Sequence, residues 1–441
     1  MDIPDNILIV GLGASGIAAA RFLSRLGKRI GLADEKSEAA LDSALKSLDG
    51  IPFTGHFGPH RDEDFAAYPM IVLSPGVDSE LPVLQRARKS GVRVIGEMEL
   101  ASSFINEPVI AITGTNGKTT TTSLIGAIFE KAFGPVFVGG NIGNPLINYV
   151  ADGRRNSHVI VEVSSFQLET IETFKPATAL LLNITEDHLD RYRSYNEYKE
   201  AKYRIFDNQT EKDFAVVKKG LEVAMKGTPR VLQFSVTDEL DEGAFSKDGR
   251  LYVRLDGRET SWPRNLSPLV GVHNTENILA AILAARIHHI DPKIIEEALK
   301  TFRGLSHRVE FVRTVRGVSF YNDSKATNVD ATKRALEGMA GGIILIAGGK
   351  DKGGSYRAIR EESGKIKALI AIGEARDKIA SELGDIIPTY REVDMTAAVY
   401  RAFAEAGNGD IVLLSPMCSS YDMFRDYKDR GNIFRRIVEA L

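Results

Sequence analysis

The sequence predicts an α/β protein of three domains, each built around a mainly parallel sheet. Glycine-rich turns at residues 11–16 and 114–120 each follow a short apolar run and lead into a helical pattern. In the last third of the chain, four apolar runs alternate with helical patterns. The length of 441 residues fits about three domains at ~150 residues each. We place the domains at 1–105, 106–303 and 304–441.

The first domain opens with a predicted strand over residues 6–10, the turn Gly11-Leu12-Gly13-Ala14-Ser15-Gly16, and a helix to about Leu26. A second strand over 29–33 ends at Asp34, at the distance where an acid bonds a ribose hydroxyl in a Rossmann-like unit. This pattern favours a nucleotide or nucleotide-sugar ligand. Glycines that only permit tight helix packing are the plainer alternative.

Another predicted strand, over residues 70–73, ends in Ser74-Pro75-Gly76. Ligands of open α/β sheets bind at this end of the strands, so Gly76 could approach the same ligand, although a Pro-Gly pair is also a common turn. A strand near 92–95 and a polar stretch at 106–108 close the domain.

The second domain opens with a strand over 109–112 and the loop Gly114-Thr115-Asn116-Gly117-Lys118-Thr119-Thr120, and a helix is predicted from Thr119 to about Lys131. Loop and first-turn amides can surround one anion, and the helix dipole adds positive charge. Lys118 supplies a full charge, and Thr119 supplies a hydroxyl for the magnesium that accompanies a triphosphate. The loop departs from a full Walker A pattern because Ile112 stands where a glycine is expected.

A lone acid, Glu162, lies in the apolar run 159–163. A buried carboxylate is costly unless a cation or donors meet it, so we predict a metal ligand, with a salt-bridged structural glutamate as the alternative. Ser164 lies on the same side by the two-residue period and could contact the phosphate or the metal shell. A strand over 177–182 then leads to acids and His188, where we predict a metal or substrate role.

Three further features complete this domain. The helix predicted over 196–206 carries Lys202 on what the sequence alone indicates is a solvated face. Residues 243–262 resemble a hairpin with Asp248-Gly249 at its turn. Asn274 and Asn277 precede a helix over 278–287 and are one turn apart, so both can face one polar ligand such as adenine; helix capping by Asn274 is the alternative.

The third domain is predicted to be Rossmann-like, with strands over 319–321, 343–347, 368–372 and 411–414. Polar clusters follow three of these strands, at 322–328, 348–352 and 415–420. Because parallel strands end at one edge of a sheet, the clusters predict a third ligand site.

Composition excludes several classes of protein. A net charge of −3 and a pI near 6.3 give no basic field, so nucleic acid is not an expected partner. The single cysteine, Cys418, permits no internal disulfide and fits a reducing cytosol. No signal peptide and no run of ~18 apolar residues is present, so we expect a cytoplasmic protein without a membrane segment.

Three sites suggest a three-substrate reaction in which ATP phosphorylates a carboxylate and an amine attacks the acyl phosphate. Two like unit charges 4 Å apart repel by ~4 kcal/mol at an effective dielectric near 20, so the anionic reactants need cations between them. Magnesium and four side chains in motif positions can supply these: Lys118, Arg308, Lys325 and Lys352.

Taken together, several motifs resemble the Mur ligases of peptidoglycan synthesis over essentially the whole chain. They are residues 114–119, 162–167, 183–191, 273–274 and 306–308. Residues 323–328 and 415–424 are similar to the family's D-glutamate-adding members, and the Asp-Asn-Pro-Arg pattern of the diaminopimelate-adding members is absent. The resemblance implies a monomeric ATP-dependent ligase that adds D-glutamate to UDP-N-acetylmuramoyl-L-alanine in cytoplasmic precursor synthesis, without nucleic acid or membrane partners.

The resemblance also implies roles for individual residues. ATP would be bound by Gly114, Thr115, Asn116, Gly117, Lys118, Thr119, Thr120, Asn274, Asn277, Arg308 and Asp323. The UDP-substrate would be bound by Ala14, Ser15, Asp34, Glu35, Lys36, Gly76, Asn141, Ser164 and His188. D-glutamate would be bound by Lys325, Thr327, Lys352, Ser420 and Tyr427.

Two magnesium ions are implied, with ligands from Thr119, Glu162, His188 and a carbamylated Lys202; the catalytic set is Lys118, Glu162, His188 and Lys202. Carbamylation needs the neutral amine, and deprotonation at pH 7 costs ~4.6 kcal/mol from a pKa near 10.4. The chain departs from the family in two places. Tyr427 stands where Phe is expected, and Lys350-Asp351-Lys352 differs in order, which leaves the role of Asp351 open.

Alternatives remain at this point. A Mur-type ligase for another amino acid would share most motifs, and folylpolyglutamate synthetases share the triphosphate loop but would not use the Gly11-Gly13-Gly16 domain for a UDP-sugar. An NAD-dependent oxidoreductase would explain the first domain but leaves Lys118 and the third domain without purpose. A nucleotide switch predicts slow hydrolysis that no amino acid affects.

Overall fold

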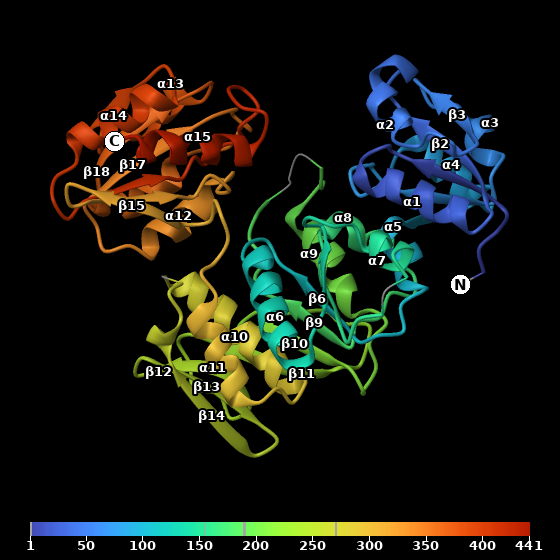
Figure 1. The fold of residues 1–441 in the computed structure, drawn as a ribbon, viewed down its shortest axis with the longest axis horizontal. Coiled ribbons are helices and arrows are strands. Elements are labelled where there is room, and N and C mark those ends of the chain that lie inside the picture. The colour runs from blue at the N-terminus through green and yellow to red at the C-terminus, as the bar shows by residue number, and fades with distance from the viewer. Residues whose placement is uncertain (1, 154, 188–190, 270) are drawn as a thin grey trace. The chain divides into compact units, whose positions relative to one another are not determined.

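The computed structural model describes all residues except 1, 154, 188–190 and 270. It has three sheets, coloured from blue to red along the chain in Figure 1, and confirms the α/β class with mainly parallel sheets. The chain divides into two compact units: residues 1–266 with 276–300, and residues 267–275 with 301–441. The first unit holds two sheets and the second holds one, while the predicted boundaries at 105/106 and 303/304 stay predictions.

The first sheet is parallel, in the order β3-β2-β1-β4-β5. Its strands are β1 (Asn6–Val10), β2 (Arg29–Asp34), β3 (Phe53–Phe57), β4 (Met70–Leu73) and β5 (Arg93–Gly96). The helices are α1 (Ala14–Arg25), η1 (Glu38–Leu41), α2 (Asp42–Lys46), α3 (Asp62–Ala66), α4 (Pro82–Lys89) and α5 (Glu97–Ser102). The chain reverses direction across the sheet at β1, so the loops after β1 and β4 flank the crevice where such sheets bind ligands.

The second sheet has the order β14-β13-β12-β11-β10-β9-β6-β8-β7 and is parallel from β7 to β12. Its strands are β6 (Val109–Thr113), β7 (Phe137–Gly140), β8 (Val159–Glu162), β9 (Thr178–Leu181), β10 (Phe214–Lys218), β11 (Arg230–Ser235), β12 (Gly243–Lys247), β13 (Arg250–Leu255) and β14 (Arg258–Pro263). The helices that follow its strands are α6 (Lys118–Phe133), α7 (Leu146–Ala151), α8 (Ser165–Leu168), α9 (Tyr195–Tyr203), η2 (Arg204–Phe206), η3 (Arg264–Leu266), α10 (Val272–Ile287) and α11 (Pro292–Thr301).

The predicted hairpin over 243–262 is one part of a three-stranded antiparallel meander. Asp248 and Gly249 both have positive φ, 49° and 70°, as a tight turn between β12 and β13 requires. Asp256 and Gly257 repeat this geometry, with φ of 51° and 71°, and lead into β14. The same Asp-Gly signal therefore marks both turns, although only the turn at Asp248-Gly249 was predicted.

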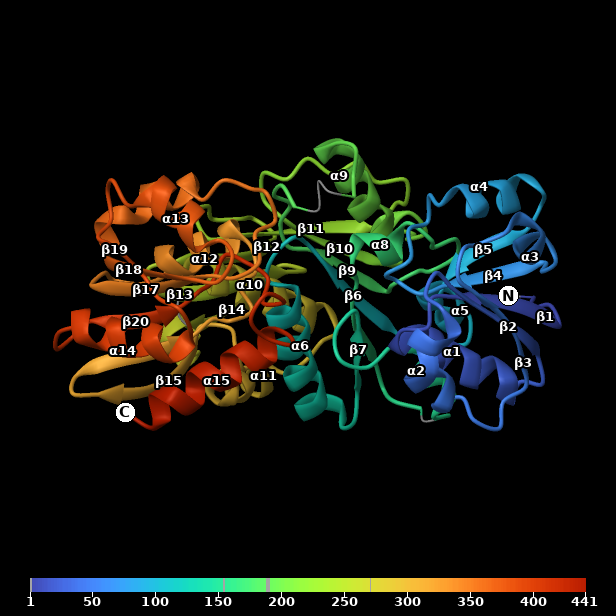
Figure 2. The same ribbon diagram turned by 90° about the horizontal axis from the view of Figure 1, so that it is seen from above.

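The first two sheets are joined through α5, which carries two buried glutamates. The carboxylate of Glu99 accepts hydrogen bonds from the backbone amides of Glu172, Thr173 and Phe174, at 2.9–3.0 Å. Glu97 accepts one from the amide of Ile147 at 2.6 Å, at the start of α7. In Figure 1, as in the contacts between helices, α5 lies beside α7, and Figure 2 shows α5 next to α1. These bonds fasten the first domain to the second within the first unit.

The third sheet has the order β15-β16-β20-β17-β18-β19, antiparallel only between β15 and β16. Its strands are β15 (Glu310–Val315), β16 (Val318–Asn322), β17 (Ile343–Gly348), β18 (Ile366–Ile372), β19 (Thr389–Arg391) and β20 (Ile411–Leu414). The helices are α12 (Val329–Glu337), η4 (Arg357–Lys365), α13 (Arg376–Leu383), α14 (Met395–Glu405) and α15 (Tyr427–Glu439). Because β16, β20 and β17 are neighbours, the three polar clusters do follow adjacent strands at one edge.

Among the described residues, none of the helices is long and apolar enough to cross a membrane.

Candidate active site

The loop after β6 is shaped by two glycines that no other residue could replace without strain. Gly117 has φ of +85° and caps α6, which begins at Lys118, one residue before the predicted start. A Cβ on Gly117 would lie 2.2 Å from Oδ1 of Asn277, so Asn277 lies against the loop as its predicted ATP role requires. A Cβ on Gly114, with φ of +150°, would lie 3.2 Å from the carbonyl oxygen of Asn183.

Asn183, two residues after the end of β9, fixes the conformation of the loop after β6. Its Oδ1 accepts a hydrogen bond from the amide of Asn116 at 2.8 Å, and its Nδ2 donates to the Asn116 carbonyl at 3.0 Å. The hydroxyl of Thr115 lies 3.1 Å from both the Thr185 carbonyl and the hydroxyl of Tyr198. The loop is therefore fixed by its neighbours before any ligand binds.

Two lysines converge on this loop. Nζ of Lys118 donates to the carbonyls of Gly114 and Thr115 at 2.8 and 2.9 Å, and Nζ of Lys202 donates to the same Gly114 carbonyl at 3.0 Å. Lys202 is only 2% exposed and its Nζ lies 4.6 Å from the centre of the Tyr198 ring. The solvated face predicted from the sequence is therefore wrong. Burial first, and the charge of Lys118 second, lower the pKa of Lys202 well below its ordinary value.

Glu162 ends β8, directly beside β6 in the register that pairs it with Ile112. Its Oε1 accepts a hydrogen bond from Nδ2 of Asn141 at 3.0 Å, which brings together two predicted site residues. Its Oε2 is buried and has no hydrogen-bond partner among the residues that the structure describes. Such an orphaned carboxylate oxygen fits the ligand set that magnesium prefers, and within the described part of the chain no salt bridge to Glu162 supports the structural alternative.

The structure bears differently on three other residues predicted in this region. His188 lies outside the described residues. The hydroxyl of Ser164 caps α8, accepting a hydrogen bond from the amide of Gln167 at 3.2 Å while the Gln167 side chain accepts one from the Ser164 amide at 3.0 Å. The ligand role of Ser164 stays a prediction. A ligand that binds Ser164 would share its hydroxyl with the Gln167 amide. Nor does Asn274 cap α10, because that helix begins at Val272, two residues earlier.

The first sheet forms its own site at the predicted turn. A Cβ on Gly16 would lie 1.9 Å from the Gly11 carbonyl oxygen, so glycine there permits the tight approach of α1 to the turn. The Ser74 hydroxyl donates to that same carbonyl at 2.6 Å and joins the loops after β1 and β4. Asp34 accepts hydrogen bonds from the amides of Leu12 and Lys36 at 2.9 and 3.0 Å. The carboxylate of Asp34 therefore stabilises the backbone of the loops after β1 and β2 even without a ligand.

Four of the remaining residues predicted to bind the UDP-substrate are exposed at this end of the sheet and open to a ligand: Ala14, Glu35, Lys36 and Gly76. Ser15 is half-buried at the start of α1.

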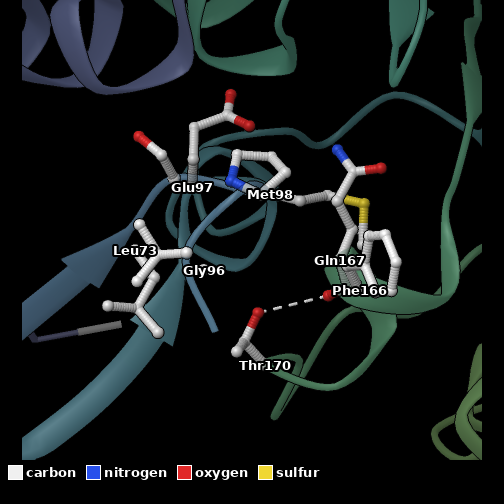
Figure 3. Close-up of a pocket in the computed structure, with 10 residues that line it drawn as sticks. Leu73, Gly96, Glu97, Met98, Phe166, Gln167 and Thr170 are labelled. Carbon is white, nitrogen blue, oxygen red and sulfur yellow. Dashed lines mark hydrogen bonds between the residues drawn. The ribbon is translucent and has the colours of Figure 1, made fainter. Parts of the chain in front are cut away.

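A small pocket lies next to this site, between the loop after β4 and helix α8. Figure 3 shows Glu97 and Met98 of α5 on one side and Phe166 and Gln167 of α8 on the other. Pro75, next to Gly76, also lines it. The pocket therefore connects the first sheet's crevice with the helix that follows Glu162.

The second unit gathers its predicted residues at the edge formed by β16, β20 and β17. Asp323 accepts hydrogen bonds from the Ser415 hydroxyl at 2.8 Å and the Val309 amide at 3.2 Å, and burial raises its pKa to about 7. Arg308 lies between His307 and Val309, whose φ angles of 66° and 46° are left-handed and strained, above all for a β-branched residue.

The predicted amino-acid site lies along the same edge. Nζ of Lys325 is 4.0 Å from the centre of the Tyr427 ring, so the Tyr that replaces the expected Phe keeps an aromatic face toward this lysine. Ser420 is buried, Thr327 is half-buried and Lys352 is exposed.

Asp351, whose role the sequence left open, has structural partners. It bonds Nζ of Lys378 and the hydroxyl of Tyr356, both at 2.9 Å, which ties its loop to α13 and to the start of η4.

Sequence reasoning missed three residues that organise these sites. Asn183 and Tyr198 stood inside motifs but had no assigned role. Arg430, which binds several loops of the second unit, was not singled out, although it precedes the buried Phe434 and Val438 by four and eight residues. That helical spacing places it on the buried face of α15 and could have revealed it.

Three family models match the chain: the Mur ligase MurD-like N-terminal domain at 5–96, the Mur ligase middle domain at 112–285, and the Mur ligase glutamate ligase domain at 307–418. Curated relatives named UDP-N-acetylmuramoylalanine–D-glutamate ligase include those of Geobacter metallireducens and Geotalea daltonii. Each is 47% identical over 441 residues, covering 99% of this chain and 97% of the relative. The relative from Acidobacterium capsulatum is 44% identical, covering 99% and 96%.

Solved structures share the fold at lower identity. A pseudomurein peptide ligase type C from Methanothermus fervidus has a TM-score of 0.61 at 19% identity, covering 99% of this chain and 100% of that one. A UDP-N-acetylmuramate-alanine ligase from Thermotoga maritima has a TM-score of 0.60 at 19% identity, covering 99% of both chains.

Proposed function

Because this chain belongs to the Mur ligase family, we propose that it joins D-glutamate to UDP-N-acetylmuramoyl-L-alanine at the expense of ATP. The observation that carries this conclusion is the 47% identity, over 99% of the chain, to ligases named for that reaction. The relatives confirm the family and the D-glutamate-adding activity predicted from the sequence. The reaction belongs to the synthesis of peptidoglycan precursors and consumes ATP.

The loop after β6 is proposed to bind the triphosphate. The first-turn amides of α6 have no acceptor within the helix, Lys118 adds a positive charge, and Asn277 lies against Gly117. Lys118 bonds two loop carbonyls at 2.8 and 2.9 Å, and we infer that it exchanges these bonds for phosphate oxygens when ATP binds. Its charge then stabilises the transferring phosphoryl group.

Magnesium is proposed to be held by Glu162, whose buried Oε2 supplies an available ligand, together with Thr119 and His188. When bound, magnesium neutralises charge between the triphosphate and the acceptor carboxylate. Asn141 orients Glu162 through the bond to Oε1 and would at the same time border the muramoyl part of the substrate. We propose that two magnesium ions bind, as the resemblance to the family implies.

We also propose that Lys202 is carbamylated. Its amine is buried beside Lys118 and Glu162, where burial disfavours the charged form and so favours the neutral amine that reacts with carbon dioxide. The nitrogen forms a bond to the carbon of carbon dioxide and loses a proton, which turns a cation into an anionic carbamate. Such an anion could join Glu162 as a metal ligand.

The remaining substrates are assigned to the other two sheets. The crevice between the loops after β1 and β4 is proposed to bind the uridine diphosphate part, through Ser15, Asp34 and their exposed neighbours. Lys325, Thr327, Lys352, Ser420 and Tyr427 are proposed to bind the carboxylates of D-glutamate. Once its amine is deprotonated, D-glutamate attacks the acyl phosphate, forming the amide and releasing phosphate.

The test is phosphate release from ATP in the presence of UDP-N-acetylmuramoyl-L-alanine and one candidate amine at a time. We expect release with D-glutamate and little with L-alanine or diaminopimelate. Equal release with either of these would assign the chain to a different amino acid. Release that no amino acid affects would favour a nucleotide switch.

A matched pair of variants tests the triphosphate loop. Lys118→Ala removes an aimed cation and should lower turnover by at least about 100-fold while UDP-substrate binding persists. Lys131→Ala, exposed in the last turn of the same helix, should leave turnover unchanged. Near-normal turnover in Lys118→Ala would refute the site.

Three further predictions stand as proposals: a monomeric enzyme, a cytoplasmic location, and small molecules as the only substrates.

A further inference from the structure

Arg430, on α15, is a fully buried arginine whose donors meet backbone carbonyls and one hydroxyl. Its exposure is 0%, and its Nε donates to the Ser324 hydroxyl at 2.9 Å. Nη2 donates to the carbonyls of Ser324 and Cys418 at 2.8 and 3.1 Å, and Nη1 to those of Cys418 and Ser419 at 3.1 and 3.3 Å. The Gly348 carbonyl lies 3.5 Å from Nη1.

These acceptors belong to all three loops at the edge of the third sheet. Ser324 follows β16, Gly348 ends β17, and Cys418 and Ser419 follow β20. One planar guanidinium therefore fixes three loops whose strands are far apart in the sequence. An ammonium group could not do so, because it lacks the five donors in a rigid fork.

The same loops carry the proposed D-glutamate residues. Lys325 follows Ser324 directly, Ser420 follows Ser419 directly, and Lys352 lies four residues after Gly348. Tyr427 is on the same helix, three residues before Arg430, and its carbonyl accepts a hydrogen bond from the Ser324 hydroxyl at 2.8 Å. Lys325 and Ser420 are therefore adjacent in sequence to residues that Arg430 binds, and Tyr427 is linked to Arg430 through the Ser324 hydroxyl, whereas Lys352 lies further along the chain from Gly348.

The charge of Arg430 is not neutralised locally. In the part of the chain that the structure describes, no carboxylate lies within 4 Å of its guanidinium, and Asp422 and Asp323 act on it only at longer range. Hydrogen bonds to neutral carbonyls satisfy the donors but leave the positive charge in place. In a buried setting such a charge attracts anions more strongly than an exposed one does.

We propose that Arg430 is a positioning residue of the D-glutamate site, which fixes the loops that carry Lys325 and Ser420 against the start of α15, where Tyr427 lies, and adds a buried positive charge beside them. The substrate class it serves is a dicarboxylic amino acid, whose two negative charges need fixed cations in a defined arrangement. This inference rests on the proposed location of the D-glutamate site.

The test compares KM values for the three substrates in Arg430→Met, Arg430→Lys and Ser324→Ala. Arg430→Met removes both fork and charge and should raise KM for D-glutamate by about tenfold or more, because the loops that carry Lys325 and Ser420 lose their shared donor. Arg430→Lys keeps the charge and should show a smaller increase. KM for ATP and for the UDP-substrate should change less than about threefold in all variants.

Ser324→Ala removes one acceptor of Arg430 and is the mildest variant, so it keeps the test decisive if Arg430→Met fails to fold. It should raise KM for D-glutamate by about threefold or more. An unchanged KM in Ser324→Ala and Arg430→Lys would overturn the proposal.

Phe434→Leu is the control for general destabilisation. It lies one turn beyond Arg430 on α15, is 0% exposed, and packs in the apolar core of the second unit. It should lower the melting temperature yet leave KM for D-glutamate unchanged; an equal rise in KM there would show that Arg430 acts only through stability. Lys325→Ala separates the positioning role of Arg430 from the proposed location of the D-glutamate site. An unchanged KM for D-glutamate in Lys325→Ala would show that the site is not where we propose it.

Discussion

Gly117 is a residue whose backbone and surroundings both demand glycine. Its φ of +85° is left-handed, and a Cβ there would lie 2.2 Å from Oδ1 of Asn277. Gly117→Ala should therefore displace Asn277 or the loop, lower turnover by about tenfold or more, and cost at least ~1 kcal/mol of folding free energy. Steady-state kinetics and chemical denaturation measure the two effects.

Gly364→Ala is the matched control. Gly364 lies in η4, has no left-handed φ, and a Cβ there would have no atom within 4 Å. We expect normal turnover and unchanged stability. If Gly117→Ala behaved like this control, the loop would tolerate a side chain and its described shape would be wrong.

Glu97 is a buried acid with one unsatisfied oxygen. Burial raises its pKa from 4.5 to about 7, and Oε2 has no hydrogen-bond partner among the described residues. The native state therefore holds a proton that the unfolded chain releases above pH 4.5. Stability from this group is complete below pH 4.5 and is lost as the pH rises to 7, by roughly 3 kcal/mol at ~1.4 kcal/mol for each tenfold change in proton affinity.

Glu97→Gln removes this titration while keeping an oxygen to accept the bond from the Ile147 amide. The difference in unfolding free energy between variant and parent should shift in the variant's favour as the pH rises from 4.5 to 7, and then become constant. Denaturation curves at several pH values measure it. A difference that does not vary with pH would contradict the buried, proton-holding state of Glu97.

At the scale of elements, the base of the second sheet carries two histidines in apolar surroundings. His158 precedes β8, and His288 follows the end of α10, with ring centres 5.2 Å apart and Phe129 at 5.0 and 5.2 Å from the two rings. Nε2 of His288 bonds the Thr178 hydroxyl at 3.0 Å, at the start of β9. Burial lowers the pKa of His288 from 6.5 to about 4.

Low pH should therefore lower the free energy of unfolding through protonation of His288. The unfolded chain binds a proton at His288 below pH 6.5 and the native state does so only near pH 4, so stability is present above pH 6.5 and falls by about 2 to 3 kcal/mol between those values. His288→Gln should remove that loss, as measured by unfolding free energy against pH. His289→Asn, at an exposed neighbour with φ of 57°, should retain it. If the unfolding free energy of His288→Gln depended on pH as strongly as that of the parent, His288 would not be the group responsible.

Elements with strong local signals were predictable from the sequence. The apolar runs gave β1 and β4 with their observed ends, and the glycine turn at 114–120 gave the start of α6 to within one residue, whereas α1 begins at Ala14, inside the turn predicted at 11–16. The edge strand β3 and the glycine-rich β7 were missed because neither is a continuous apolar run. The position of the three polar clusters at one edge of the sheet followed from the parallel-sheet rule, whereas the adjacency of β16, β20 and β17 was not predicted.

Site residues were predictable where a motif carries its own chemistry, as in residues 114–120. Burial of Lys202 was not, because its neighbours on α9 are mostly polar and only the packing of the loop over Tyr198 encloses it. Asn183 and Arg430 act by binding backbone of distant loops, so their partners exist only in the fold. Helical spacing could reveal that Arg430 is buried, but it does not show which loops Arg430 binds.

At the scale of the whole molecule, the division into two compact units predicts two thermal transitions. Ile160 lies in β8 in the first unit and Phe434 in α15 in the second, both 0% exposed. Ile160→Ala and Phe434→Ala should each cost ~2 to 5 kcal/mol and lower one transition while the other stays in place, as measured by scanning calorimetry. A single transition that both variants lower equally would show that the units unfold as one.

The three-stranded meander at the border of the second sheet has a practical consequence. Its last strand, β14, presents Arg258 and Glu259 and ends at Pro263, which discourages another chain from adding to that border. The turn at Asp256 and Gly257 is exposed and joins β13 to β14, and four strands separate β13 from β6. An affinity tag or fluorescent reporter inserted between these two residues would allow the enzyme to be immobilised or tracked without disturbing its chemistry.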